Sequence, residues 1–170
     1  MSLRWMRPTV ALAAIALTAS GCAMFATGNS PTGTELTEPI VFAGVASIDE
    51  GACPADRPNA YESRLQGAQC IVIDPDTIIE TEGGTVALVA ASEQAPDVPE
   101  SIEIALDDPY AERLRALTAS LAAQEAPRSQ LMIAVGGEVR AMPVVMDELT
   151  GNTVSISGNG LTALYDRLTE

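Results

Sequence analysis

The stretch LMIAVGGEVRAMPVVMDELTGNTVSISGN, residues 131–159, is the part of this sequence that decides the fold. Its apolar, strand-forming runs are broken twice by glycine-containing turns, a pattern typical of consecutive β-strands. It predicts strands over residues 131–135, 139–146 and 153–157. The stretch contains no histidine, cysteine or lysine. We therefore interpret it as a structural sheet rather than a catalytic segment.

The turns and alternation within this stretch support that interpretation. Gly136-Gly137 supplies the positive φ that a tight hairpin turn requires. Pro143 in the second run indicates an edge strand or a bulge, because proline cannot donate to a sheet ladder. A second turn is expected at 150–152. In the third run, Val154 and Ile156 share the face that we expect to point inward.

A helix is predicted immediately before this stretch, over residues 107–123. Asp108 is suited to the N-cap, and Pro109 to the first helical position. The apolar side chains recur at helical spacing and predict one buried face, formed by Tyr110, Leu114, Leu117 and Leu121.

The remaining pattern extends this arrangement into an α+β domain. Further strands are expected over residues 39–48, 70–74 and 101–106. Residues 77–91 predict two strands joined by a hairpin at Gly83-Gly84, although the alanine-rich second run also suits a helix. Helical structure is expected over 61–66 and over 161–168, the latter with Thr162 as a cap. The predicted fold is an antiparallel sheet of about five or six strands with two helices.

The N-terminus predicts export and lipidation. Arg4 and Arg7 precede a short apolar run, and the sequence Ala19-Ser20-Gly21-Cys22 follows. This order is that of a secretory signal, and it resembles a bacterial lipoprotein signal with Cys22 as the acylated residue. Acyl chains such as palmitate on Cys22 would hold the protein on the extracytoplasmic side of the cell membrane. An ordinary signal peptide and an uncleaved anchor remain alternatives.

The chain therefore divides into three predicted parts. Residues 1–21 are the signal, 22–38 a flexible tether rich in Gly, Ser, Thr and Pro, and 39–170 a single folded domain. Cys53 and Cys70 are the two cysteines of this domain. Since exported proteins of the cell envelope meet oxidising conditions, we expect a disulfide between them, with two separate thiols as the alternative.

Composition excludes several classes of function. The net charge is −14, all nine basic residues are arginine, and histidine is absent. Such an acidic chain repels phosphate backbones, so we expect no nucleic-acid partner. Ser-His and Cys-His catalysis and lysine Schiff bases are excluded by composition. The acidic residues of 74–82 lack the EF-hand spacing. We expect no catalytic residue, no cofactor and no metal site.

The C-terminal region resembles the extracytoplasmic P1 head of the SecD/SecDF protein-export family. The resemblance rests on IAVGGEVRAMPVV (133–145), TGNTVSISGNG (150–160) with its I-S-G-N, and the strand and helix before them. It covers about residues 100–170. It implies a head-like α+β fold and a place near export machinery. The transmembrane acidic residues and the P1 base of that family have no counterpart here, so no motor activity is implied.

Three classes of function remain open on this evidence. The first is a membrane-anchored binding module that contacts the translocon or exported polypeptides through a sheet edge or an apolar groove. The second is an envelope lipoprotein that uses the same fold as a scaffold or adaptor for an unrelated partner. The third is a hydrolase that depends on a pair of carboxylates. The chemistry missing from the sequence favours the first two, in which the protein is not an enzyme.

Overall fold

The computed structural model describes residues 33–90, 100–158 and 160–170. Its helices are η1 (Pro75–Thr77), α1 (Asp108–Ala122) and α2 (Leu161–Thr169). Its strands are β1 (Thr34–Glu35), β2 (Ile40–Glu50), β3 (Ala60–Ser63), β4 (Gln69–Ile73), β5 (Ile79–Thr81), β6 (Gly84–Val89), β7 (Ser101–Leu106), β8 (Leu131–Val135), β9 (Glu138–Ala141) and β10 (Thr153–Ser157). All strand pairs between these elements are antiparallel, which confirms the predicted α+β class.

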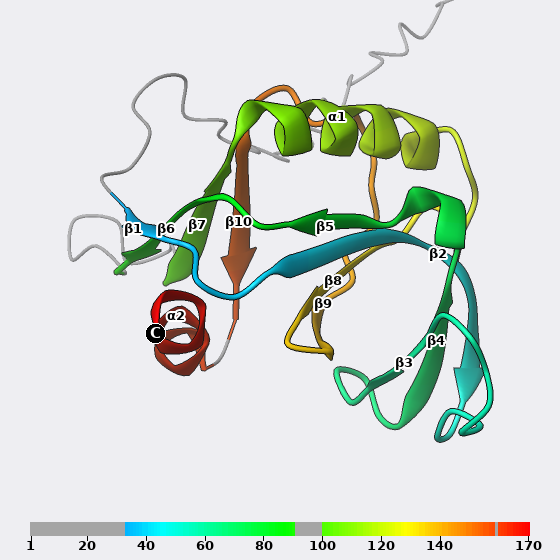
Figure 1. Ribbon diagram of the computed structural model, residues 1–170. Coiled ribbons are helices and arrows are strands. Elements are labelled where there is room, and N and C mark those ends of the chain that lie inside the picture. The colour runs from blue at the N-terminus through cyan, green and yellow to red at the C-terminus, as the bar shows by residue number, and fades with distance from the viewer. Residues whose placement is uncertain (1–32, 91–99, 159) are drawn as a thin grey trace, which may run out of the picture.

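The strands form two sheets where the sequence predicted one. The first sheet has the order β1-β6-β7-β10, and the second has the order β3-β4-β2-β8-β9 with β5 paired to β2. Figure 1 shows α1 above the strands and α2 below β6 and β7, while β3, β4 and the end of β2 extend away at the lower right. The long strand β2 is therefore the element that joins the two halves of the second sheet.

Strand β8 is the centre of the molecule, and its composition explains why. All five of its residues are buried, so both of its faces are covered by other side chains. Leu131, Ile133 and Val135 point into a core shared with the helices, while Met132 and Ala134 point into a second core. A strand buried on both faces requires a continuous apolar run rather than an alternating one, as LMIAV provides.

The larger core lies between the helices and the two sheets. Both helices contribute their apolar stripes to it: Ala111, Leu114, Leu117 and Leu121 of α1, and Leu161, Leu164 and Leu168 of α2. The predicted buried face of the first helix is therefore confirmed, with Tyr110 packed at its margin. The smaller core lies on the face of the second sheet that points away from the larger core.

Two details of the predicted hairpins are wrong. Gly83-Gly84 does not turn one strand back on the next, since β5 pairs with β2 while β6 pairs with β1 and β7. The glycines mark the point where the chain leaves one sheet for the other. Likewise the regular part of the strand predicted over 139–146 ends at Ala141, although Leu131 still donates to the Pro143 carbonyl and Val145 to the Ser129 carbonyl. The third predicted strand, β10, pairs with β7 and not with this strand. The Gly136-Gly137 hairpin is confirmed, with φ of 56° and 77°.

Other local predictions shift by one element or one residue. The helical turn expected over 61–66 is wrong. These residues begin in strand β3, where Tyr61 pairs with Ile71 of β4. The N-cap of α1 is Asp107 rather than Asp108, and Gly160 rather than Thr162 caps α2. Residues 77–91 contain strands and no α-helix in their described part.

The folded domain begins earlier than residue 39. Strand β1 lies in the segment predicted to be tether, and it pairs with the edge of β6. Leu36 and Glu38, also in the predicted tether, bond to Gly84 and Arg167 of the folded domain. The predicted signal, residues 22–32 of the predicted tether and residues 91–99 lie outside the described residues. Among the helices of the described ranges, none is long and apolar enough to cross a membrane.

Candidate functional site: a cleft between the two sheets

A cleft of about 700 Å³ opens where the two sheets diverge below β8. Four elements border it: the end of β3, the β8–β9 hairpin, the end of β10 and the first turns of α2. Its lining residues are Glu62, Arg64, Leu65, Gly136, Gly137, Glu138, Val139, Arg140, Ile156, Ser157, Gly158, Gly160, Leu161 and Leu164. The cleft thus joins parts of the chain that are about a hundred residues apart.

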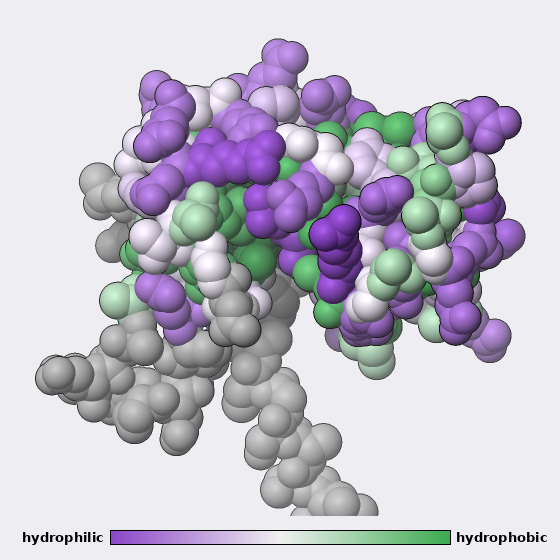
Figure 2. All heavy atoms as spheres, turned by 90° about the horizontal axis from the view of Figure 1, so that it is seen from below, coloured by the Kyte–Doolittle hydropathy of each residue, from purple (hydrophilic) through white to green (hydrophobic). Residues whose placement is uncertain are grey.

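The floor of the cleft is apolar. Ile156, Leu161 and Leu164 come from β10 and α2, and each is no more than 6% exposed. Leu65 stands at the rim with 48% of its surface exposed. Seen from below, the surface shows a hydrophobic hollow flanked by hydrophilic side chains (Figure 2). An apolar floor with a polar rim is the usual composition of a binding site.

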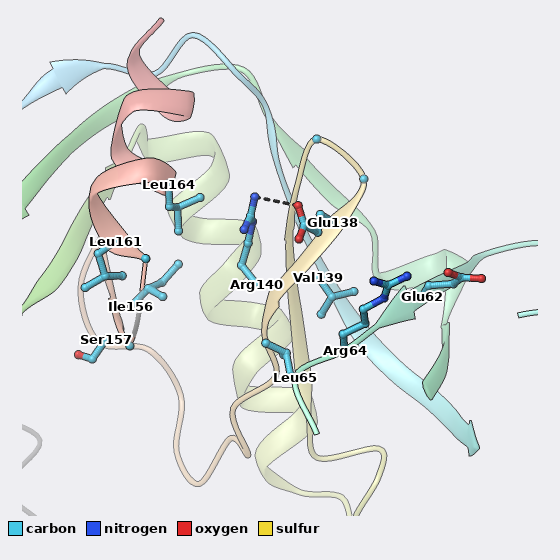
Figure 3. A pocket seen from close by; sticks show the side chains of 14 residues that line it. Glu62, Arg64, Leu65, Glu138, Val139, Arg140, Ile156, Ser157, Leu161 and Leu164 are labelled. Atoms are coloured by element: carbon cyan, nitrogen blue, oxygen red, sulfur yellow. Dashed lines mark ion pairs between the residues drawn. The ribbon is translucent and has the colours of Figure 1, made fainter. Parts of the chain in front are cut away.

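Arg140 brings a guanidinium to the apolar side of the cleft. A β-bulge sets this position: Val139 pairs with Ala134 and Ala141 with Ile133, so Arg140 is the extra residue of β9 and regular alternation is interrupted there. Figure 3 shows the Arg140 side chain between Leu164 and Glu138, with its guanidinium joined to Glu138 by the dashed line. Its Nη2 pairs with Glu138 Oε2 at 2.9 Å. Its Nε is buried and has no hydrogen-bond partner.

Arg64 provides a second guanidinium at the opposite rim. It follows β3 directly, and its side chain is exposed beside the cleft (Figure 3). None of the ion pairs in the described part of the chain includes Arg64. Glu62 lies on the same rim and is also exposed.

A third arginine, Arg167 of α2, contacts the β8–β9 hairpin that lines the cleft. Arg167 donates from Nε to Glu38 Oε2 at 2.8 Å and from Nη2 to Glu38 Oε1 at 3.1 Å. The hydrogen bond and the charge of Glu38 raise the pKa of Arg167. Arg167 Nη1 also lies 3.6 Å from Glu138 Oε2. This arginine is therefore engaged in structural pairs, whereas Arg64 is available to a ligand.

The edge of β10 offers unpaired main-chain groups beside this floor. The Leu106 amide donates to the Asn152 carbonyl at 2.8 Å, which makes these residues a hydrogen-bonded pair. In an antiparallel ladder such pairs alternate, so Val154 and Ile156 direct their main-chain groups toward β7. The N–H and C=O groups of Thr153, Ser155 and Ser157 consequently face the other edge. No strand of the described chain pairs with that edge.

The predicted cysteine pair is brought together as a disulfide. Cys53 and Cys70 are bonded, with their Cα atoms 4.8 Å apart. The loop that they close contains β3 and the rim residues Arg64 and Leu65, so the disulfide anchors one wall of the cleft. Cys22, the predicted lipidation site, lies outside the described residues.

Sequence reasoning did not identify Arg64 and Arg140 as site residues. The sequence around Arg140, Glu138-Val139-Arg140-Ala141, reads as an ordinary alternating strand and did not mark it as a site residue. No local signal marks Arg64, because its approach to the cleft depends on the pairing of β3 with β4. The I-S-G-N residues that carried the family resemblance contribute Ile156, Ser157 and Gly158 to the cleft wall.

The polar groups of the cleft are few. Its carboxylates are Glu62 and Glu138, and Glu138 is 60% exposed and paired with Arg140. Among the described residues, no group of three or more His, Cys, Asp or Glu side chains is arranged to hold a metal ion. What the arrangement offers is an apolar floor, guanidinium donors and a strand edge.

Comparison with known proteins assigns no family to the chain. No known family model matches the sequence, and no curated protein matches it. The resemblance to the SecD/SecDF head remains a prediction from residues 100–170.

Proposed function

We propose that this chain is a non-catalytic binding module that holds extended polypeptide segments on the extracytoplasmic face of a membrane. The observation that carries the proposal is the unpaired edge of β10 beside an apolar cleft floor. An extended peptide can add to such an edge through its main chain and place alternate side chains in the adjoining pocket. Main-chain pairing is indifferent to sequence, which suits a protein that meets many different chains.

The proposed location comes from the N-terminal sequence. The order of basic residues, apolar run and Ala19-Ser20-Gly21-Cys22 favours export and acylation at Cys22. A lipid anchor would confine the cleft to within reach of polypeptides that emerge from the membrane. The resemblance to the SecD/SecDF head supports the same setting, with exported chains or the translocon as partners.

In-cell photo-crosslinking tests this function. A photoreactive residue in place of Ser157, which is exposed in the cleft, is compared with one in place of Arg115, which is exposed on α1 outside it. We expect the probe at Ser157 to capture translocon subunits or many unrelated exported chains, and the probe at Arg115 to capture few of them. Identical captures at the two positions would contradict a role for the cleft.

Reproducible capture of one envelope protein would contradict the export role in a different way. It would assign the fold to an adaptor or scaffold for that partner. Mass spectrometry of the crosslinked products separates these outcomes, since a generic binder yields many adducts and an adaptor yields one.

A further inference from the structure

We infer that the polypeptide segment bound in the cleft presents a carboxylate to Arg140 and Arg64 while its main chain pairs with the free edge of β10. This inference rests on the proposed function and adds the chemistry of the partner. The carboxylate is that of an acidic side chain within the segment, and a free C-terminus is the other outcome that the test can give. The experiment below distinguishes these two sources.

The first observation is the incomplete coordination of Arg140. Its Nη2 is used by Glu138, but its Nε is buried without any acceptor. Buried polar groups are nearly always hydrogen-bonded, and an unpartnered donor beside an open cleft indicates an acceptor that arrives with a ligand. A planar guanidinium matches the two oxygens of a carboxylate better than it matches a single carbonyl.

The second observation is the position of Arg64 on the facing rim. The chain has a net charge of −14, so its overall field repels an acidic segment. Acidic recognition therefore requires local cations. Arg64 is such a cation, since it is exposed at the cleft and joins no ion pair of the described chain. Arg64, directly after β3, and Arg140, in β9, both line the cleft that Ile156 and Ser157 of β10 also border.

The third observation is the spacing imposed by strand addition. A segment paired with Thr153, Ser155 and Ser157 turns alternate side chains to one face. On that face lie the apolar floor of Ile156 and Leu161 and the guanidinium of Arg140. The occupant that fits is an extended peptide with alternating apolar side chains interrupted by one acidic group.

The binding test uses the full chain in detergent and short fluorescein-labelled peptides. The parent peptide alternates valine and threonine, carries one central glutamate and ends in an amide. Its relatives replace the glutamate by glutamine or lysine, or move the only carboxylate to a free C-terminus. Fluorescence polarisation gives the dissociation constant of each peptide.

We expect the glutamate peptide to bind about tenfold more tightly than the glutamine peptide, the range expected for a charge-assisted hydrogen bond. The lysine peptide should bind more weakly still. Tighter binding of the free-terminus peptide than of the glutamate peptide would assign the site to chain ends, and the reverse order would assign it to internal acidic residues.

Two arginine variants and a matched control locate the effect. Arg140→Gln and Arg64→Gln should each remove most of the preference for glutamate over glutamine. Arg115→Gln, on the exposed face of α1, should leave that preference unchanged. Retention of the full preference in both cleft variants would overturn the carboxylate inference.

The strand edge is tested separately, so that the two proposals can fail independently. Ser155→Pro removes a main-chain donor at the free edge of β10, and Glu35→Pro does the same at the opposite edge of this sheet. The second position follows from the Leu36 amide, which donates to the Gly84 carbonyl and turns the main chain of Glu35 outward. Ser155→Pro should abolish binding of every peptide, whereas Glu35→Pro should not.

N-methylation of alternate peptide bonds in the probe gives the same test without any change in the protein. It should abolish binding by removing the probe's own ladder donors. If N-methylated and unmodified peptides bind equally, strand addition is wrong and the proposed function fails with it. If the glutamine peptide binds as tightly as the glutamate peptide, only the carboxylate inference fails.

Discussion

Arg167 on α2 and Glu38 before β2 form a two-point ion pair across 129 residues of sequence. The arginine Nη2 also donates to the Gly136 carbonyl at 3.4 Å. The pair therefore joins the last helix, the entry to β2 and the β8–β9 hairpin. The hairpin and α2 both line the cleft, so the pair holds these two walls in place relative to each other.

Replacement of this arginine by lysine should loosen α2. Arg167→Lys keeps the charge but loses the two parallel hydrogen bonds that a guanidinium makes with a carboxylate. We expect faster amide hydrogen exchange in α2 and no change in α1. Arg115→Lys is the matched control, since Arg115 is exposed on α1. Equal exchange in α2 for the two variants would show that the pair contributes no order.

The same pair should be insensitive to pH over the physiological range. Its hydrogen bond with Glu38 raises the pKa of Arg167, so the arginine's contribution to stability is complete below the unfolded-state pKa. It is lost only as the pH rises through the still higher folded-state pKa. Thermal unfolding of Arg167→Gln and wild type between neutral and mildly alkaline pH should give a constant difference in Tm. A difference that narrows in that interval would contradict the assignment.

The two glycines of the β8–β9 turn should respond differently to alanine. Both have positive φ, where an L-residue costs about 1–2 kcal/mol. A Cβ at Gly136 would also collide with the guanidinium of Arg167 and the carboxylate of Glu38, whereas one at Gly137 meets no atom within 4 Å. Urea unfolding should therefore show a larger loss for Gly136→Ala. Equal losses would mean that the ion pair moves aside without effect.

Burial predicts opposite consequences for two leucines. Leu168→Ala truncates a side chain with 0% exposure in the larger core and should lower the free energy of unfolding by about 2–5 kcal/mol. Leu65→Ala truncates a side chain that is 48% exposed at the cleft rim, so its effect on stability should stay within about 0.5 kcal/mol. Peptide affinity should fall for Leu65→Ala. If the Leu65→Ala protein is stable and binds the peptide with unchanged affinity, Leu65 at the rim does not contribute to binding.

Reduction of the disulfide should weaken the domain and its cleft together. The bond closes a segment with a sequence separation of 17, for which loop entropy predicts about 3 kcal/mol of stabilisation. Since β3 and Arg64 lie within that segment, reduced protein should also bind the glutamate peptide more weakly. Urea unfolding and peptide titration with and without dithiothreitol measure both effects. Unchanged affinity in folded, reduced protein would show that β3 keeps its place without the bond.

The lipidation prediction is tested at Cys22. A Cys22→Ala variant should remain unprocessed and lack the mass of the acyl chains in intact-protein mass spectrometry. Wild-type protein should show both cleavage before Cys22 and the added lipid. Processing of both chains at the same site, with a mass difference equal to that of the Cys-to-Ala replacement alone, would refute acylation at this residue.

Local structure was largely predictable from the sequence. Apolar periodicity located α1 and α2, and strand-forming runs located most strands to within a few residues, because these signals arise from neighbours along the chain. The Gly136-Gly137 turn was predicted for the same reason. The Cys53–Cys70 pair required only the cysteine count and the inferred compartment.

Sheet assignment and the cleft were not predictable in this way. The alternation of β10 would suit a place beside β9 as well as its actual place beside β7, and Gly83-Gly84 suits a hairpin as well as a crossing between sheets. Local pattern does not distinguish such partners, because the choice depends on the packing of side chains from distant segments. Arg64 and Arg140 therefore line one cleft because of strand pairings between distant segments, which cannot be predicted from the residues around either arginine.

The sequence by itself determined both α-helices, most of the strands, the hairpin at β8–β9 and the composition that removes histidine and lysine chemistry, but not β1 or β3. Tertiary structure decided which strands pair, and so created the free edge of β10 beside an apolar floor. The physical reason is the distance along the sequence over which each effect acts. Turn geometry and periodicity depend on residues a few positions apart. Burial of β8 on both faces depends on side chains from segments far apart in the sequence.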